Sequence, residues 1–200
     1  MPHDKPHSPS CLRNQEPILH ELRDLLRDAS RVWEIGSGTG QHAVFFGRAL
    51  PHLTWMPSDR PEHHPGIEAW RNEAALPNVE PVRTFDLFDL EPPVDEADAL
   101  LAINVIHIAP WEATARLFAH ADTALRDDGQ VILYGPYIHP QRPLEPSNQR
   151  FDQWLRERDL RSGIRELEKI DACARARGFE RVITRRLPAN NDLLVYRRTR

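Results

Sequence analysis

The amino-acid sequence predicts an α/β domain in which a mostly parallel, seven-stranded sheet is covered by helices on both faces. Three observations predict this fold. Helical and strand-like patterns alternate along the chain, the central strand-like runs are apolar almost without interruption, and residues 179–198 contain two strand-like runs joined by a short turn. The alternation favours parallel strands linked by helices. The closing pair of runs is typical of an antiparallel hairpin.

The helices are expected where apolar residues recur three or four positions apart, or where residues favour a helix end. Ile18, Leu22 and Leu25 fall on one face of the first helix. Pro110 suits the first turn of a helix, and Gly178 suits the left-handed residue that closes one. The expected helices are residues 17–28, a helix that begins near Gln41, and residues 66–75, 110–126, 148–158 and 164–177.

The strands are expected where short apolar runs separate these helices. Residues 97–106 are apolar almost throughout, which is typical of a central strand buried on both faces. Residues 136–148 are rich in proline and are expected to form a loop over one end of the sheet, as a lid or pocket wall. The expected strands are residues 31–35, 53–58, 81–85, 97–106 and 130–135, then a hairpin over 179–198 that turns at 188–191.

Length and composition favour one soluble domain. The 200 residues are 40% hydrophobic, enough for one well-buried core. Residues 1–10 have no hydrophobic region and are expected to be a flexible tail, so residues 11–200 form the domain. The formal net charge of -4 lacks the basic character that binding to nucleic acid usually requires, so nucleic acid is not expected as a partner.

The cysteines and the apolar segments indicate a cytoplasmic protein. Cys11 and Cys173 show no paired or metal-type spacing, which fits a reducing compartment. No apolar segment approaches the ~18 residues of a membrane span. His63 and His64 follow Asp59 closely, but adjacent histidines on a loop point in different directions, so no metal site is expected.

A glycine-rich loop follows the first expected strand. Gly36, Gly38 and Gly40 leave backbone N–H groups open to a negatively polarised ligand at the start of the next helix. With Ala43, the last two of these glycines satisfy a dinucleotide pattern, and Asp59 lies at a suitable distance to bond a ribose. The loop is therefore consistent with an NAD-binding oxidoreductase.

Glu34 gives the same loop a second interpretation. The acid lies two residues before the first glycine, and the string from Glu34 to Gly40 resembles the first motif of class I S-adenosylmethionine-dependent methyltransferases, where the acid helps place the cofactor's methionine amino end. In that superfamily, an acid placed like Asp59 bonds both ribose hydroxyls, and a polar residue placed like Asp86 faces the adenine amino group. The terminal hairpin resembles the superfamily's antiparallel seventh strand. No tyrosine is followed by Lys at the spacing of short-chain dehydrogenases, so NAD is less favoured.

A closer resemblance runs from Arg13 to Asn191. The chain contains, in order, RNQEPIL, EIGSGTGQHAVFF, WMPSD, NVIHIAPW, LYGPY, SNQRFDQWLR and LPANN, which look like the successive motifs of the methyltransferase-like protein 26 family. The resemblance implies a Rossmann-like class I methyltransferase fold and S-adenosylmethionine as cofactor. It supplies no settled substrate, so the acceptor has to be argued from the residues.

The chemistry is expected at the carboxyl ends of the strands, where ligands bind in open α/β sheets. Residues 36–40, 104–111 and 134–137 converge there, which makes Asn104 a candidate cofactor residue. His107 is the candidate general base, because neutral imidazole can take a proton from the attacking nucleophile. In the other interpretation, its side chain only hydrogen-bonds a loop backbone.

Further polar and aromatic residues are candidates for the two ligands. Arg13 pairs with the cofactor carboxylate or is simply solvated, and Asn14 contacts substrate or caps a helix. Asn148 has the same two interpretations, and asparagine also favours turn geometry. The candidate substrate residues are Asn14, Trp111, Tyr137, Asn148, Asn190 and Asn191.

The sequence thus predicts a cytoplasmic S-adenosylmethionine-dependent methyltransferase that acts on a small molecule. The absence of a basic surface and the enclosing loop 136–148 favour a small acceptor. The main alternative is a non-catalytic module that binds S-adenosylmethionine or S-adenosylhomocysteine and works through a protein partner. The two hypotheses differ at the acceptor side of the cofactor, where an enzyme needs an accessible cavity.

Overall fold

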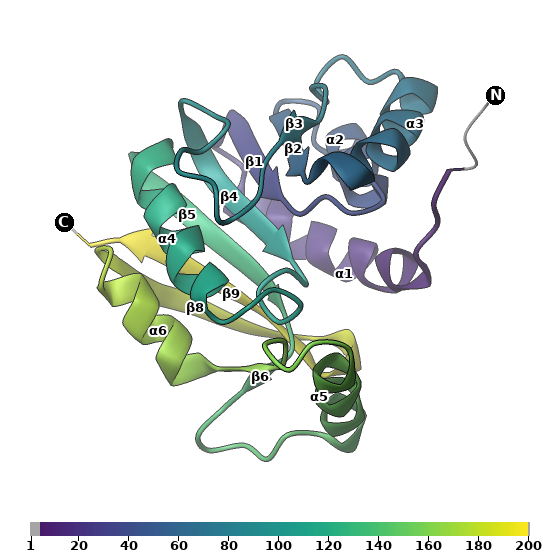
Figure 1. The fold of residues 1–200 in the computed structure, drawn as a ribbon. Coiled ribbons are helices and arrows are strands. Elements are labelled where there is room, and N and C mark those ends of the chain that lie inside the picture. Colours follow the sequence, from purple (N-terminus) through teal and green to yellow (C-terminus); the bar gives the residue numbers. More distant parts are fainter. Residues whose placement is uncertain (1–4, 200) are drawn as a thin grey trace.

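The computed structural model describes residues 5–199, and Figure 1 shows their arrangement. Residues 1–4, from the predicted tail, and Arg200, the end of the predicted domain, lie outside the described residues. The helices are α1 (Pro9–Leu25), α2 (Gln41–Ala49), α3 (His64–Ala74), α4 (Glu112–Ala124), α5 (Pro146–Arg158) and α6 (Leu167–Arg175), with the 3-10 turns η1 (Pro61–His63) and η2 (Pro188–Asn190). The strands are β1 (Arg31–Ile35), β2 (Thr54–Asp59), β3 (Arg83–Thr84), β4 (Ala97–Ile103), β5 (Leu125–Gly135), β6 (Tyr137–Ile138), β7 (Arg165–Glu166), β8 (Phe179–Leu187) and β9 (Asn191–Arg198).

The main sheet has seven strands in the order β3-β2-β1-β4-β5-β9-β8. The first five in this order pair in parallel, whereas β9 runs antiparallel to β5 and β8 runs antiparallel to β9. This arrangement confirms the predicted α/β class with its antiparallel C-terminal hairpin. The strand order reverses at β1, which lies between β2 and β4, so the sheet has a topological switch point beside the glycine-rich loop.

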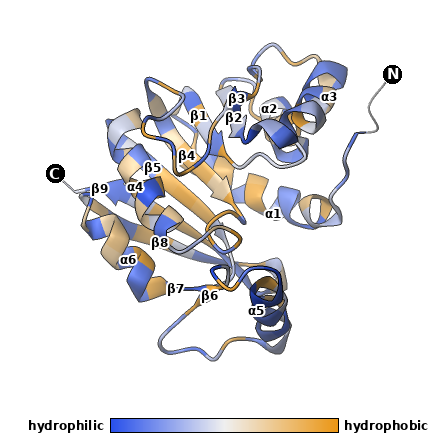
Figure 2. Cartoon of the chain, viewed as in Figure 1, coloured by the Kyte–Doolittle hydropathy of each residue, from blue (hydrophilic) through white to orange (hydrophobic). Residues whose placement is uncertain are grey.

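Helices cover both faces of this sheet (Figure 1), and an apolar core lies between the sheet and the helices on each face. Phe118 of α4 and Ile170 of α6 pack with Trp33 on one face. Ile18 of α1 and Phe46 of α2 pack on the other. Figure 2 shows that the central strands are largely apolar whereas α5, at one end of the sheet, is largely hydrophilic. The continuous apolar runs of the central strands follow from this burial on both sides.

The first helix begins earlier than predicted, at Pro9 rather than near Pro17. The reason is a tertiary contact, because residues 5–8, which precede this helix, pack against α3 and α2. The Trp70 indole N–H donates to the Pro6 carbonyl at 2.8 Å, and Lys5 Nζ lies 4.0 Å from the centroid of the same indole. Residues 5–8, predicted as part of the flexible tail, therefore pack against the domain.

The segment between β5 and α6 also differs from the prediction. The predicted loop 136–148 contains β6, which pairs in parallel with β7. This pairing takes up Arg165 and Glu166, so α6 begins at Leu167 instead of residue 164. In residues 5–199, no helix is long and apolar enough to cross a membrane.

Candidate active site

A cavity of about 500 Å³ lies at the carboxyl ends of β1, β2, β3 and β4. It therefore occupies the switch point of the sheet, where ligands bind in open α/β folds. Its wall includes residues that follow each of these strands, together with Asp159 and Arg161 from the segment after α5. Five predicted cofactor residues line it: Gly36, Gly38, Asp59, Asp86 and Asn104.

The glycine loop has the conformation that its glycines permit. Gly36, Gly38 and Gly40 have φ values of +69°, +58° and +86°, in the left-handed region. A Cβ on Gly40 would lie 2.7 Å from the Ile67 Cα, so Gly40 serves the packing of the loop against α3 and does not line the cavity. At Gly38, the nearest atom to an added Cβ is 4.0 Å away, which leaves open space on the cavity side.

Asp59 ends β2 beside this loop. Its Oδ2 accepts a hydrogen bond from the Gly38 N–H at 2.7 Å, and its Oδ1 accepts one from the Arg60 N–H at 2.8 Å. These two bonds fix the carboxylate at the cavity wall. Two carboxylate oxygens offer about four lone-pair positions, so acceptor capacity remains for a ligand's hydroxyl groups.

Glu34 lies beneath the loop and outside the cavity wall. Its Oε2 accepts hydrogen bonds from Ser37 Oγ at 2.9 Å and from Trp55 Nε1 at 3.1 Å. Burial raises the pKa of this carboxyl to about 7, and the nearby charge of Asp59 acts in the same direction. The contacts seen for Glu34 therefore support the loop, while its predicted role at the cofactor's amino group stays a prediction.

Asp86 and Asn104 bring polar groups to opposite sides of the cavity. Asp86 follows β3, and its Oδ1 accepts a hydrogen bond from the Phe88 N–H at 2.9 Å. Asn104 follows β4 and has a φ of +58°, which is rare for a residue other than glycine. Its N–H donates to the Tyr134 carbonyl at 2.8 Å, so the strained residue is held by the neighbouring strand. Such strain is typical of functional positions.

His107 lies just beyond β4 but outside the cavity wall. The side chain is 1% exposed, and within the described residues neither ring nitrogen has a hydrogen-bond partner. The interpretation of His107 as a side chain bonded to loop backbone is therefore wrong. Burial lowers the pKa of this imidazole to about 3, and the positive charge of Arg165 adds to the effect. The ring packs edge-on against Phe151, with 5.7 Å between the ring centroids.

The predicted asparagines form three separate hydrogen-bonded pairs. Asn14 Oδ1 lies 2.8 Å from His42 Nε2, and Asn191 Nδ2 donates to the Tyr134 hydroxyl at 3.0 Å. Asn148 Nδ2 donates to the Asn190 carbonyl at 2.9 Å, which ties α5 to the hairpin turn. Asn14 and Asn148 lie inside α1 and α5, so the helix-cap interpretation is wrong for both.

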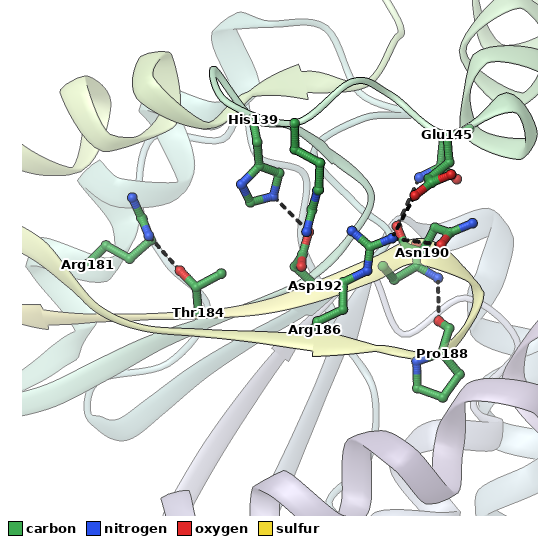
Figure 3. Close-up of polar contacts among 11 residues, drawn as sticks. His139, Glu145, Arg181, Thr184, Arg186, Pro188, Asn190 and Asp192 are labelled. Carbon is green, nitrogen blue, oxygen red and sulfur yellow. Dashed lines mark hydrogen bonds and ion pairs between the residues drawn. The ribbon is translucent and has the colours of Figure 1, made fainter.

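An arginine in the strand that leads into the hairpin turn stabilises the turn. Figure 3 shows Arg186 of β8 beside Asn190 and Glu145. The Arg186 Nη2 atom donates to Asn190 Oδ1 at 2.7 Å and lies 3.3 Å from a Glu145 carboxylate oxygen. The interpretation of Asn190 as a turn residue fits its left-handed φ of +60°.

The remaining candidates also lie outside the cavity wall. Trp111 is partly buried in the core on the α4 face, with the Arg165 guanidinium 5.8 Å from its ring centroid. Tyr137 is buried, and that burial raises the pKa of its hydroxyl. Arg13 is exposed on α1, and its charge acts on the pKa of Tyr134.

Sequence reasoning did not single out four residues at this edge of the sheet. Phe88 and Ile108 line the cavity and remain partly exposed, and Arg161 reaches it from after α5. No local pattern marks these three. Tyr134, whose hydroxyl accepts a hydrogen bond from Asn191, lies within the predicted segment 134–137 but was not singled out.

The fold and the switch-point cavity define a Rossmann-like protein with the architecture of S-adenosylmethionine-dependent methyltransferases. Similar solved structures include the S-adenosylmethionine-dependent methyltransferase SibL in its apo form, at a TM-score of 0.77 and 23% identity over 95% of this chain and 56% of that one. An O-methyltransferase family protein from Burkholderia thailandensis is similar at a TM-score of 0.77 and 16% identity, over 94% of this chain and 57% of that one. Human N-acetylserotonin methyltransferase in complex with S-adenosylmethionine is similar at a TM-score of 0.75 and 16% identity, over 94% of this chain and 52% of that one.

The chain itself belongs to the family described as protein of unknown function DUF938, which matches residues 5–198. It spans little more than half the length of the solved proteins named above. At these identities, the likeness establishes the fold. The resemblance to the methyltransferase-like protein 26 family stays a prediction.

Proposed function

We propose that this protein is an S-adenosylmethionine-dependent methyltransferase that acts on a small-molecule acceptor. The observation that carries the proposal is the convergence of Gly36, Gly38, Asp59 and Asp86 on one cavity at the switch point. The methyltransferase architecture of the fold supports it. The solved structure of mitomycin 7-O-methyltransferase, at a TM-score of 0.75 and 20% identity, adds a small-molecule enzyme to these relatives.

The residues present fit the proposed cofactor. A cavity of about 500 Å³ is within the range of small-molecule sites. The open space at Gly38 admits a ligand close to the loop backbone, and Asp59 retains acceptor positions for two ribose hydroxyls. Asp86 supplies an acceptor for the adenine amino group. When bound, S-adenosylmethionine supplies an activated methyl group on its sulfonium.

In the proposed reaction, this chain acts mainly by positioning. Methyl transfer requires the nucleophile, carbon and sulfur to be in line, and orientation alone can supply much of the rate. His107 is the candidate base, since its lowered pKa keeps the ring neutral at pH 7. A pKa of about 3 also means that the ring holds a proton weakly, so we assign it less of the rate than positioning.

The burial of His107 favours one second candidate function. Because His107 is buried and does not line the cavity, the predicted base does not contact the proposed cofactor site. A non-catalytic module that binds S-adenosylmethionine or S-adenosylhomocysteine, and that acts through a protein partner, would not need one. An NAD-binding oxidoreductase is less favoured, because Asp86 at the cavity wall has no particular role in binding a dinucleotide.

The test is formation of S-adenosylhomocysteine from S-adenosylmethionine in the presence of the small-molecule fraction of a cell extract. We expect product with the wild-type protein, a loss of at least tenfold with Asp59→Ala, and no change with Asp95→Ala, which removes an exposed carboxylate. Asp59→Ala loses two hydrogen bonds at the loop, so its thermal unfolding is measured alongside.

Two further arms separate the candidates. If His107 is the base, His107→Ala reduces turnover and leaves cofactor affinity near normal, whereas unchanged turnover gives it a structural role. If the wild-type protein binds the cofactor yet forms no product with either the small-molecule or the protein fraction, the non-catalytic module replaces the enzyme.

A further inference from the structure

Four successive backbone carbonyls after β4, those of residues 106–109, each accept a hydrogen bond from one segment, residues 162–165, which lies between α5 and α6. The partners are 54 to 59 positions apart in the sequence. In the order of these carbonyls, the donors are Arg165 Nε, the Gly163 N–H, Ser162 Oγ and Arg165 Nη2. The first three bonds are 2.9 Å long. The turn after β4 is therefore held in place by a part of the chain that is distant in sequence.

Arg165 provides two of these bonds and a third within its own segment. Its Nη2 atom also donates to the carbonyl of Arg161 at 2.9 Å. Only 9% of Arg165 and 5% of Ser162 are exposed, so little water reaches these bonds. Because the guanidinium is planar and rigid, its N–H groups fix the carbonyls that they bond relative to one another. Arg165 therefore joins the turn after β4 to the segment after α5.

Both of the joined parts line the switch-point cavity. Ile108 and Ala109 line it from the turn, and Asp159 and Arg161 line it from the segment after α5. Arg165 bonds one residue of each pair, at the carbonyls of Ala109 and Arg161, but does not line the cavity itself. This side of the cavity wall is therefore one hydrogen-bonded unit made of two loops.

The segment after α5 is in turn bonded to that helix. The Ile164 N–H donates to Asp152 Oδ1 at 2.6 Å, and Arg156 Nε donates to the other carboxylate oxygen of Asp152 at 2.8 Å. Phe151 of the same helix packs edge-on against His107 of the turn. Since α5 lies beside the loop after β4 (Figure 1), it supports the same side of the cavity wall.

A cavity wall that is already ordered favours ligand binding. A loop that becomes ordered only when the ligand binds loses conformational entropy at that moment, and this loss lowers the affinity. The bonds of Arg165 order both loops before a ligand enters. Breaking these bonds leaves the same residues around the cavity but allows the two loops to move apart.

We propose that Arg165 is a positioning residue of the cofactor site, which holds the turn 106–109 and the segment 159–162 at the spacing that bound S-adenosylmethionine requires. It acts through the residues whose carbonyls it bonds. The inference rests on the proposed function, because it takes the switch-point cavity as the cofactor site. It adds the segment after α5 to that site.

The experiment measures two properties of the full chain: the affinity for S-adenosylhomocysteine, by calorimetry, and the temperature of thermal unfolding. Arg165→Met keeps an unbranched side chain and removes three hydrogen bonds. We expect it to weaken S-adenosylhomocysteine about tenfold or more. Arg181→Met is the matched control, because it also removes three hydrogen bonds, to Asp171 and Thr184, but does not line the switch-point cavity. We expect the control to lower the unfolding temperature and to leave the affinity unchanged.

Two further variants grade the effect. Arg165→Lys keeps the charge but lacks the planar fork, so its affinity should lie between those of the wild type and Arg165→Met. Ser162→Ala removes only the bond to the Ile108 carbonyl and should weaken the ligand by a smaller factor than Arg165→Met. It also provides a test if Arg165→Met does not fold.

Hydrogen exchange tests the same coupling in the wild-type protein. The Gly163 N–H is bonded to the His107 carbonyl, so its exchange rate reports whether the two loops are joined. Because the coupling between ligand binding and loop ordering is reciprocal, bound S-adenosylhomocysteine should slow this exchange. In Arg165→Met, the exchange without ligand should be faster than in the wild type.

The positioning role is contradicted if Arg165→Met folds and binds S-adenosylhomocysteine like the wild type, and the proposed function then still stands. Equal losses of affinity in Arg165→Met and Arg181→Met indicate general disruption and also overturn the role. If Arg165→Met does not fold, an unchanged affinity in Ser162→Ala overturns it. A wild-type protein that does not bind S-adenosylhomocysteine overturns the proposed function and this inference with it.

Discussion

Glu34 is a carboxyl group that its position in the molecule removes from water. Its carboxyl is fully buried beneath the glycine loop and is stabilised by hydrogen bonds from Ser37 and Trp55. Those two donors do not offset the cost of burying a charge, so the pKa rises from the ordinary 4.5 to about 7. The folded chain therefore holds a proton that the unfolded chain has already lost between these pH values.

This difference makes stability depend on pH in a defined direction. Because the folded-state pKa is the higher one, the contribution of Glu34 is favourable at low pH and is lost as pH rises through about 7. We compare the free energy of unfolding of Glu34→Gln with that of the wild-type protein. Between pH 5 and pH 8, we expect this difference to move in favour of Glu34→Gln by about 3 kcal/mol, on the conversion of pKa to free energy.

Urea unfolding across this pH range checks the prediction. His42 and His107 titrate in both proteins, so the difference between the two proteins isolates Glu34. Glu157→Gln, on the exposed side of α5, is the control and should follow the wild-type curve. A difference between wild type and Glu34→Gln that stays constant with pH would show that the carboxyl ionises normally.

The loop between β1 and α2 is shaped at its two ends by different neighbours. Gly36 lies against Val105, where an added Cβ would come within 2.8 Å of the valine Cγ2. Gly40 lies against the backbone of Ile67 in α3. At Gly38, between them, an added Cβ would meet no atom closer than 4.0 Å, so the outer glycines set the loop's position and the middle one leaves space for a ligand.

Two alanine substitutions separate these roles. Gly40→Ala should lower the free energy of unfolding by more than about 2 kcal/mol, because the left-handed penalty adds to an overlap with backbone that cannot move aside. Gly38→Ala should cost only the left-handed penalty of about 1 kcal/mol yet weaken binding of S-adenosylhomocysteine. Urea unfolding and calorimetry on both variants check this. Equal destabilisation by the two would contradict the packing role of Gly40.

At the scale of the whole molecule, sequence patterns predicted the layers and the strand-end site. The spacing of apolar residues is a local property of the sequence, so the strands and the hairpin could be predicted from it. The position of Asp59, Asp86 and Asn104 at one cavity could be predicted because residues that follow parallel strands share one edge of the sheet. His107 was misplaced because the turn after β4 directs Ile108 toward the cavity and the imidazole toward Phe151.

The features that were missed depend on contacts between residues far apart in the chain. The docking of Pro6 on Trp70 lengthens α1, and no local pattern near Pro9 indicates it. The contact between Asn14 and His42 joins α1 to α2 in the same way. Each requires the folded sheet to exist before the two partners meet.

The central claim is that the switch-point cavity binds S-adenosylmethionine, and calorimetric titration of the wild-type protein tests it most directly. We expect S-adenosylmethionine to bind at one site per chain, NAD to bind far more weakly, and Asp59→Ala to weaken S-adenosylmethionine by at least tenfold. Preferential binding of NAD, or binding of S-adenosylmethionine that Asp59→Ala leaves unchanged, would contradict the account.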